Sequence, residues 1–173
     1  MESNLPHVSG EFAHALSTLL EHNVDFVLCG GVACVLHGVA RVTADLDICV
    51  AMSRDNLMRL LEALGDLHFH PRIPEPAEAL LSSARRQEWI DSKGAMVFTF
   101  VHGKSPLQID VFLHYPIAYT ELRSAAQRLR LQGADLLISS KRDLIRAKQH
   151  VQPMRTVDER DIHDLKELIA REQ

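Results

Sequence analysis

Two short apolar runs lie close together near the start of the chain, and a pair of glycines, Gly30 and Gly31, directly follows the first of them. The first run, residues 24–29, is rich in β-branched and aromatic residues, which is typical of a buried strand. The second run, residues 46–50, alternates as a strand does, and residues 32–36 between the runs are predicted to form a short helix. This order of elements predicts a sheet with helices packed against it.

Helical periodicity, capping residues and turn sequences define further elements on both sides of this segment. In chain order they are a helix before residue 24, a helix capped by Ser53, an antiparallel hairpin of residues 96–101 and 106–112, two short strands around Gly133, and two helices near residues 141–151 and 157–170. The last two helices are expected to be capped by Ser140 and Thr156, which have capping-box spacing to Asp143 and Glu159. Residues 70–76, with three prolines, are predicted to form a loop, residues 75–86 are weakly helical, and the segment around Trp89 has no assignment. We therefore expect an α/β (α+β) fold in which a core, residues 1–138, carries a C-terminal helical segment, residues 139–173, packed on it.

The composition is that of a single compact domain, because 46% of the 173 residues are hydrophobic and 24% are charged. No run of about 18 apolar residues is free of charge, and the first residues lack the pattern of a secretory leader. The three cysteines form no C-x-x-C pair, and the ten histidines form no zinc motif. We therefore expect a cytoplasmic protein that contacts no membrane and holds no zinc.

Positive charge is concentrated in residues 123–160, although the net charge of the chain is -4. This segment holds nine Lys or Arg against four Asp or Glu, a balance of +5. Two interpretations fit: the segment contacts phosphate groups, or it is the solvated face of surface helices. Lys148 is compatible with both, because it follows Leu144 by four residues and can bury its stem beside that apolar side chain.

Three carboxylates are predicted to converge. Side chains alternate across a strand, so Asp45 and Asp47 share one face while Leu46 and Ile48 enter the core from the other. The second hairpin strand repeats the arrangement with Asp110, and the three carboxylates meet if these strands are neighbours. Like charges repel unless a cation compensates them, and Mg²⁺ is the hard cation that oxygen ligands favour. Two such ions can bind a nucleoside triphosphate and activate an attacking hydroxyl.

Gly30 and Gly31 stand where the first strand meets the short helix. Because glycine has no side chain, their backbone N–H groups can approach phosphate oxygens closely. Taken alone, a glycine pair is more often a simple turn, and Asp-x-Asp is common in a chain with 23 acidic residues. The two features together, in this order and on these elements, indicate a nucleotide site.

The sequence GGVACVLHGVARVTADLDICV, with Asp110 on a later apolar strand, resembles the signature of the polymerase-beta-like nucleotidyltransferase superfamily. It is most similar to the small bacterial branch of AbiEii-like toxins and lincosamide nucleotidyltransferases. The tail KRDLIRAKQHVQPMRTVDERDIHDLKEL is similar to the helical end of that branch, and the likeness extends from Val24 to Leu168. It implies a nucleotidyltransferase fold, with a small mixed sheet flanked by helices and a C-terminal helical pair. It also implies an enzyme that uses Mg²⁺, with Mn²⁺ as an alternative.

The resemblance assigns a role to each matched residue. Gly30 and Gly31 would hold the triphosphate, Asp45, Asp47 and Asp110 would bind the metal and carry catalysis, and Arg41, Thr43 and Lys148 would lie near the nucleotide. Many members carry a serine after the first glycine, and its absence here leaves the phosphate grip to backbone amides and Thr43. The implied reaction transfers a nucleoside monophosphate from an NTP to an acceptor hydroxyl and releases pyrophosphate.

The sequence does not specify the acceptor: a small molecule, a protein and a tRNA end all fit. A small acceptor would depend on the unassigned middle of the chain, including Trp89. A different class of function is a catalytically idle module of the same fold, such as a toxin–antitoxin component that binds an antitoxin partner. The three retained carboxylates favour an enzyme over that alternative.

Three polar residues outside the matched set have two interpretations each. His37 either contacts substrate or ends a helix that Gly38 terminates. Asp161 and Asp164 are either solvated or paired with nearby arginines such as Arg155, or they take part in catalysis. We favour the structural interpretation of these two carboxylates, because surface ion pairs are common.

Overall fold

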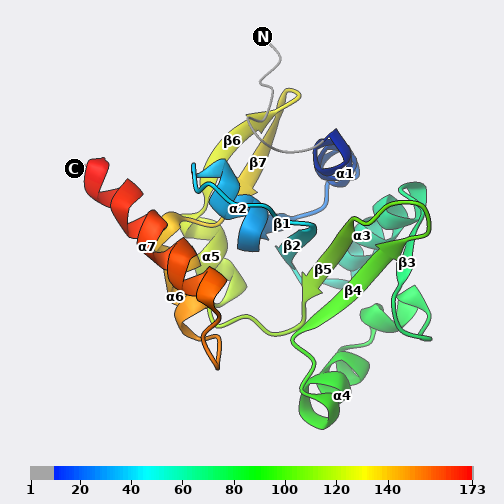
Figure 1. The fold of residues 1–173 in the computed structure, drawn as a ribbon. Helices are drawn as coiled ribbons and strands as arrows, with labels where there is room; N and C mark the ends of the chain where they lie inside the picture. Colours follow the sequence, from blue (N-terminus) through cyan, green and yellow to red (C-terminus); the bar gives the residue numbers. More distant parts are fainter. Residues whose placement is uncertain (1–9, 173) are drawn as a thin grey trace.

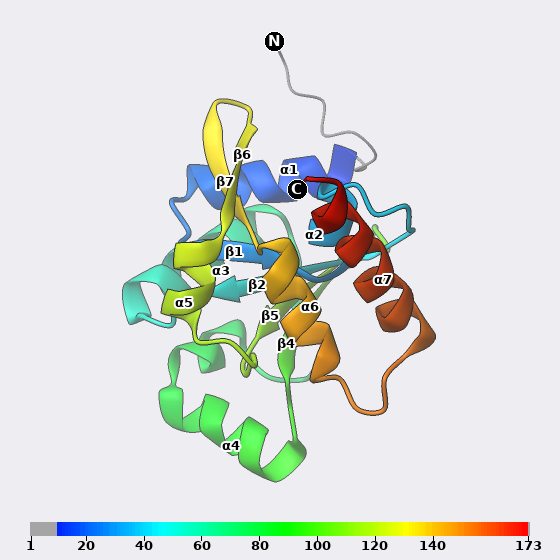
Figure 2. The same cartoon turned by 90° about the vertical axis from the view of Figure 1, so that its left-hand side faces the viewer.

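The computed structural model describes residues 10–172, and these form seven α-helices, one short 3₁₀ helix and a seven-stranded mixed sheet (Figures 1 and 2). The elements in chain order are α1 (Gly10–Glu21), β1 (Phe26–Cys29), α2 (Gly30–Leu36), β2 (Asp45–Val50), α3 (Arg54–Asp66), β3 (Phe69–Pro71), η1 (Ala77–Leu81), α4 (Ser83–Lys93), β4 (Val97–His102), β5 (Gln108–Phe112), α5 (Tyr119–Ala125), β6 (Gln127–Leu131), β7 (Ala134–Ile138), α6 (Lys141–Gln149) and α7 (Thr156–Arg171). The expected α/β fold with a mixed sheet and a C-terminal helical pair is confirmed. The division of the chain at residue 138 stays a prediction.

The strand order in the sheet is β3-β4-β5-β2-β1-β7-β6. The hairpins β4–β5 and β6–β7 are antiparallel, as is the pair β1–β2. By contrast, β2 runs parallel to β5, and β1 runs parallel to β7. Because β2 and β5 are parallel neighbours, residues that point to the same face from both strands lie side by side.

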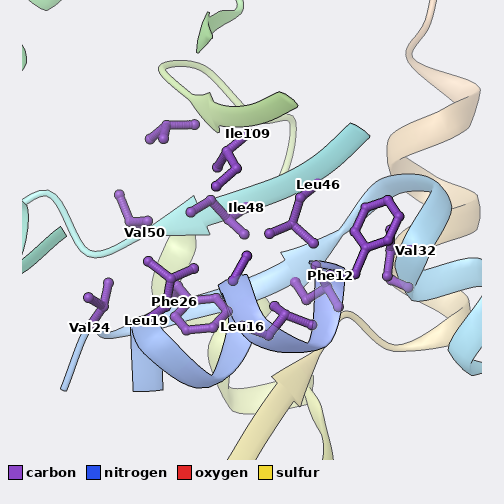
Figure 3. Close-up of a cluster of buried hydrophobic side chains, with 14 of the residues drawn as sticks. Phe12, Leu16, Leu19, Val24, Phe26, Val32, Leu46, Ile48, Val50 and Ile109 are labelled. Carbon is purple, nitrogen blue, oxygen red and sulfur yellow. The ribbon is translucent and has the colours of Figure 1, made fainter. Parts of the chain in front are cut away.

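One face of the sheet packs against α1 and contributes to the main hydrophobic core (Figure 3). Leucines and Phe12 of α1 lie on apolar side chains that β1, β2 and β5 point toward them. The side chains labelled in this part of the core are Phe12, Leu16, Leu19, Val24, Phe26, Val32, Leu46, Ile48, Val50 and Ile109. Leu46 and Ile48 are fully buried here, so the predicted orientation of β2 is confirmed.

The opposite face of the sheet carries a smaller apolar cluster. Val27, Cys29 and Cys49 point to this side and pack against Ile117 and Leu122, which come from α5 and the segment before it. The helical pair α6 and α7 packs together, and α6 also contacts α2 (Figure 1). Consequently, the end of β2 that carries Asp45 faces the space between the sheet and the C-terminal helices.

Two of the three expected helix caps are present. The Ser53 side chain accepts a hydrogen bond from the Asn56 N–H at the start of α3, and Ser140 accepts one from the Asp143 N–H at the start of α6. The expected cap by Thr156 is wrong: α7 begins at Thr156, and Arg155 in the cap position makes no side-chain capping bond. The carboxylate of Glu159 therefore lacks the reciprocal partner that a capping box requires.

The middle of the chain, for which the sequence predicted a loop and a weakly helical stretch, forms the edge strand β3, the 3₁₀ helix η1 and the helix α4. Trp89 in α4 is 2% exposed and stacks at 4.9 Å, centroid to centroid, on Phe98 of β4. The expectation that Trp89 contacts an acceptor is therefore wrong, because its ring belongs to the core. Helix α5 is a further element that no sequence pattern predicted.

The described helices include none that is long and apolar enough to cross a membrane. The three cysteines are buried and free, as expected from their apolar surroundings. His37 ends α2 and is followed by Gly38 with a φ of 105°, and its Nε2 lies 2.8 Å from the Ser139 carbonyl oxygen. This geometry favours the structural interpretation of His37.

Candidate active site

Three carboxylates meet on adjacent strands, as the alternation of β2 and β5 predicted. Asp45 and Asp47 point to one face of β2, and the register pairs Asp47 with Asp110 on the parallel strand β5. Thr99 lies opposite Asp110 on β4, and its hydroxyl donates a hydrogen bond of 2.5 Å to Asp110 Oδ1. Asp110 is therefore oriented by a neighbouring strand rather than by a loop.

The carboxylates impose an electrostatic cost on one another. Burial, together with the charges of Asp110 and Asp45, raises the pKa of Asp47 from 3.8 to about 6, although a hydrogen bond from the Gly31 backbone opposes the shift. Burial and Asp45 also raise the pKa of Asp110, while the hydrogen bond from Thr99 opposes the shift. The cluster is therefore a half-buried concentration of negative charge, and a bound cation would relieve it.

The chemistry of this donor set fits a hard divalent cation, because all three side chains offer carboxylate oxygens. Within residues 10–172, no three acidic, histidine or cysteine side chains already stand as a complete ligand set. Cation binding by Asp45, Asp47 and Asp110 stays a prediction.

Gly30 and Gly31 allow the start of α2 to lie close to β2 and to the segment that precedes it. Gly30 has a φ of 62°, and a Cβ atom at this position would collide with the carboxylate of Asp47. A Cβ atom at position 31 would lie 2.6 Å from Thr43 Oγ1 and 3.0 Å from Arg41 Cζ. Side chains at either position would displace residues expected to bind the metal or the nucleotide.

A chain of buried ion pairs lies beside the glycines. Lys148 Nζ is 2.8 Å from Asp161 Oδ2 and 3.1 Å from Asp158 Oδ1. Arg41 also pairs with Asp161, and Arg155 Nε donates to Asp158 Oδ2 at 2.6 Å. The Asp158 and Asp161 side chains are each 1% exposed, so the view that Asp161 is a solvated surface carboxylate is wrong.

The pKa values of Lys148 and Asp158 favour the charged forms of these two side chains. Burial opposes the charge of Lys148, but the Cys34 sulfur and the carboxylates of Asp161 and Asp158 outweigh it and raise the lysine pKa. Burial likewise opposes the charge of Asp158, yet hydrogen bonds from Arg155 and Lys148 hold its pKa below the usual value. The network therefore keeps a permanent positive group beside the three carboxylates.

An apolar and aromatic wall forms the remaining side of the site. Phe112 is two residues after Asp110 on β5 and so shares its face. The Phe112 ring meets the half-buried Tyr115 ring edge-on, with centroids 4.7 Å apart. Met96, Pro116, Leu144, Ala147 and Val151 continue this surface.

These groups line one cavity of about 550 Å³, a volume typical of ligand pockets. The cavity includes every residue that the sequence assigned to metal or nucleotide binding, namely Gly30, Gly31, Arg41, Thr43, Asp45, Asp47, Asp110 and Lys148. Their shared location is a structural finding, whereas their individual roles stay predictions.

Sequence reasoning missed several lining residues. Asp158, Arg155, Phe112 and Tyr115 all face the cavity. One signal was present: Asp158 and Asp161 are three residues apart on a predicted helix, so they share a face with each other. The aromatic wall gave no signal, because Phe112 has the pattern of an ordinary strand residue.

Comparisons with known proteins support the fold. No protein-family model matches the sequence, and no curated protein matches it significantly. The solved structure of the lincosamide antibiotic adenylyltransferase LnuA, bound to lincomycin, superposes with a TM-score of 0.62 at 15% identity, covering 93% of this chain and 98% of that one.

Two further structures are similar in the same way. ANT(2'')-Ia in complex with adenylyl-2''-tobramycin has a TM-score of 0.53 at 16% identity and covers 92% of this chain and 93% of that one. An antigenic nucleotidyltransferase-like protein from Paracoccidioides brasiliensis has a TM-score of 0.53 at 19% identity, covering 91% and 75%. The expected nucleotidyltransferase fold is confirmed. At these identities, the antibiotics belong to the compared proteins.

Proposed function

From its nucleotidyltransferase fold and from the contents of its cavity, we propose that this protein is a divalent-metal-dependent nucleotidyltransferase. It moves a nucleoside monophosphate from an NTP to an acceptor hydroxyl. The observation that carries the proposal is the convergence of Asp45, Asp47 and Asp110 opposite Gly30–Gly31 and the buried Lys148 in one cavity. Within residues 10–172 none of these three carboxylates forms an ion pair, and a structural role alone does not account for such a cluster on adjacent strands.

The cavity provides the groups that the proposed reaction needs. The acceptor oxygen attacks the α-phosphorus, a new O–P bond forms, and the bond from that phosphorus to the bridging oxygen breaks as pyrophosphate leaves. Asp110 accepts the hydroxyl proton, and its raised pKa suits a general base better than an ordinary aspartate would. Bound Mg²⁺ or Mn²⁺ would supply positive charge to the phosphates and to the attacking oxygen.

The other residues bind and orient the triphosphate. Gly30 and Gly31 bring backbone close to the phosphates, while Arg41 and Lys148 offer positive charge and Thr43 a hydroxyl. Catalysis then depends mainly on positioning and on charge stabilisation in a partly enclosed site, since no covalent intermediate is required.

A small acceptor with an apolar surface suits this cavity best. Phe112 is the next residue after Asp110 on the same face of β5, and its ring contacts that of Tyr115. The body of an acceptor whose hydroxyl reaches Asp110 would therefore lie over these rings. An acceptor with several positive charges is less favoured. Apart from the three carboxylates expected to bind the metal, the only acidic side chain among the described lining residues is Asp158, which is already paired with Lys148 and Arg155.

An RNA acceptor is less favoured, because the positive segment is largely neutralised. Seven of the nine cations in residues 123–160 form ion pairs with carboxylates. A nucleic-acid footprint gains affinity from the net positive charge of a surface, and these carboxylates reduce that charge. Transfer to tRNA that weakens steeply with salt would contradict this preference.

The test is a transfer screen with labelled NTPs and Mg²⁺ against small hydroxyl compounds, proteins and pooled tRNA. The variants are D47N and, as a matched control of the same charge change, D91N on the exposed side of α4. We expect the parent and D91N to transfer label, and D47N to lose at least about a hundredfold of the rate, as expected when a group acting on charge in the transition state is removed. Nucleotide binding without transfer to any acceptor would indicate an idle binding module, and a parent that binds no Mg-NTP would refute the proposal.

A further inference from the structure

Asp161 is buried, charged and outside the cavity, and its position is not explained by the proposed chemistry. Its Oδ2 forms an ion pair with Lys148 Nζ at 2.8 Å and accepts a hydrogen bond from Arg41 Nη1. Both cations line the cavity, whereas Asp161 is not among the described lining residues. We propose that Asp161 is a positioning residue that holds Arg41 and Lys148 together as one triphosphate-binding unit. This inference rests on the proposed function.

The three residues come from separate parts of the chain. Arg41 lies in the segment between α2 and β2, Lys148 in the last turn of α6, and Asp161 in α7. The carboxylate of Asp161 in α7 thus contacts both α6 and the segment between α2 and β2. Without it, Arg41 would have no carboxylate partner among the described residues, while Lys148 would keep Asp158.

Pre-ordering is the physical benefit of this arrangement. Lys and Arg side chains have many rotamers, and binding a phosphate with a free side chain costs the entropy of fixing it. Lys148 and Arg41 are already fixed, with side chains 9% and 19% exposed. Burying these charges would be costly if Asp161 did not compensate them.

Arg41 also retains donor capacity for a ligand. Its Nε is buried and makes no hydrogen bond to any protein group in residues 10–172. A buried donor without a partner is unfavourable, and it is satisfied if an oxygen of a bound phosphate takes that place. The pairing of Nη1 with Asp161 therefore fixes the guanidinium while leaving Nε available.

The sign of the effect separates positioning from simple charge. Removing a negative charge near an anion should by itself strengthen binding of the anion. If Asp161 positions the two cations, the same removal should weaken binding, because Arg41 and Lys148 become mobile. The two explanations thus predict opposite changes for D161N.

The experiment measures the dissociation constant of a fluorescent ATP analogue with Mg²⁺ for the parent, D161N, D161E and D164N, with folding checked by circular dichroism. D164N is the matched control, because Asp164 lies on the same helix, is half-buried and undergoes the same charge change. We expect D161N to weaken binding about tenfold or more, which is the effect of losing a charge-assisted contact. D164N should stay within about twofold of the parent, as is usual for substitutions away from such contacts.

D161E keeps the charge but moves the carboxylate by one methylene, so positioning predicts a loss of affinity and a pure charge effect predicts none. Inorganic triphosphate, used as a competitor, should lose affinity in D161N by the same factor, since the affected contacts are with phosphates. Unchanged or tighter ATP binding in D161N would overturn the inference while leaving the proposed function intact. If neither D161N nor D161E folds, Asp161 supports the fold and the inference is wrong. If the parent binds no Mg-ATP analogue or other Mg-NTP, the proposed function fails first.

Discussion

Removing the charge of Asp47 should stabilise the metal-free protein at neutral pH. Burial and the neighbouring carboxylates raise the pKa of Asp47 from 3.8 to about 6, a difference of about 2.2 pKa units. Each unit corresponds to about 1.4 kcal/mol, which gives about 3 kcal/mol for the ionised form. The side chain is half-buried at the mouth of an open cavity, so solvent screening reduces this to about 2 kcal/mol.

The pH dependence follows from the sign of the shift. Below pH 3.8 the carboxyl is protonated in both folded and unfolded chains, so it has no effect. Between pH 3.8 and about 6 the unfolded chain loses its proton while the folded one keeps it, and stability therefore falls as pH rises. Above that range the full cost is present. The side-chain amide introduced by D47N carries no charge, so the advantage of this variant should grow from pH 4 to pH 7 and then remain constant.

The assay is thermal melting of the parent, D47N and D91N in EDTA from pH 4 to pH 8. About 2 kcal/mol corresponds to a rise of roughly 4–8 °C for D47N at pH 7.5 in a chain of this size. D91N should show no such pH-dependent difference, and added Mg²⁺ should stabilise the parent more than D47N. A D47N protein that melts below the parent at pH 7.5 in EDTA would refute the electrostatic reasoning.

Two further substitutions test contacts around the same carboxylates. Gly30→Ala should lower the free energy of unfolding in urea by about 2 kcal/mol or more, because alanine is strained at a φ of 62° and its Cβ would displace Asp47. The control Gly103→Ala, which has open space around it, should change the free energy of unfolding little. Thr99→Val should reduce the rate of transfer about tenfold, because it removes the hydrogen bond that orients Asp110. Thr99→Ser keeps the hydroxyl and should retain most of the rate. Equal rates for the two variants would show that this hydrogen bond is dispensable.

The carboxylate cluster could be predicted because it depends on local regularity. Strand alternation determines the face on which Asp45 and Asp47 lie. Asp110, on a second apolar strand, joins them if the two strands are neighbours in the sheet. In the structure β2 and β5 are neighbours, and their register pairs Asp47 with Asp110. Helix caps with a serine before the helix were predictable for the same reason, since Ser53 and Ser140 act within three residues.

The pairing of Asp161 with Arg41 could not be predicted because the two residues are distant in sequence. Arg41 and Asp161 are 120 positions apart, and their contact depends on how α7 packs on α6 and how α6 lies against α2. Sequence reasoning therefore considered nearby arginines such as Arg155 as partners for Asp161. The prediction for Trp89 was wrong for a different reason. A lone tryptophan was expected to serve an acceptor, but its burial against Phe98 is ordinary packing of the hydrophobic core.

The order of the glycine pair and the Asp-x-Asp sequence has a structural cause in the pairing of β1 with β2. The antiparallel register places Cys29 opposite Asp47, so the next residue, Gly30, is where the chain leaves the strand and turns over the Asp47 side chain. A side chain at position 30 would occupy the place of that carboxylate, and a φ of 62° is favourable there only for glycine. The hydrogen bond from the Gly31 backbone to Asp47 then ties the same turn to the same carboxylate. The glycine segment and the strand that carries Asp47 are thus one unit, and a substitution in either is expected to alter both the fold of the turn and the charge of the site.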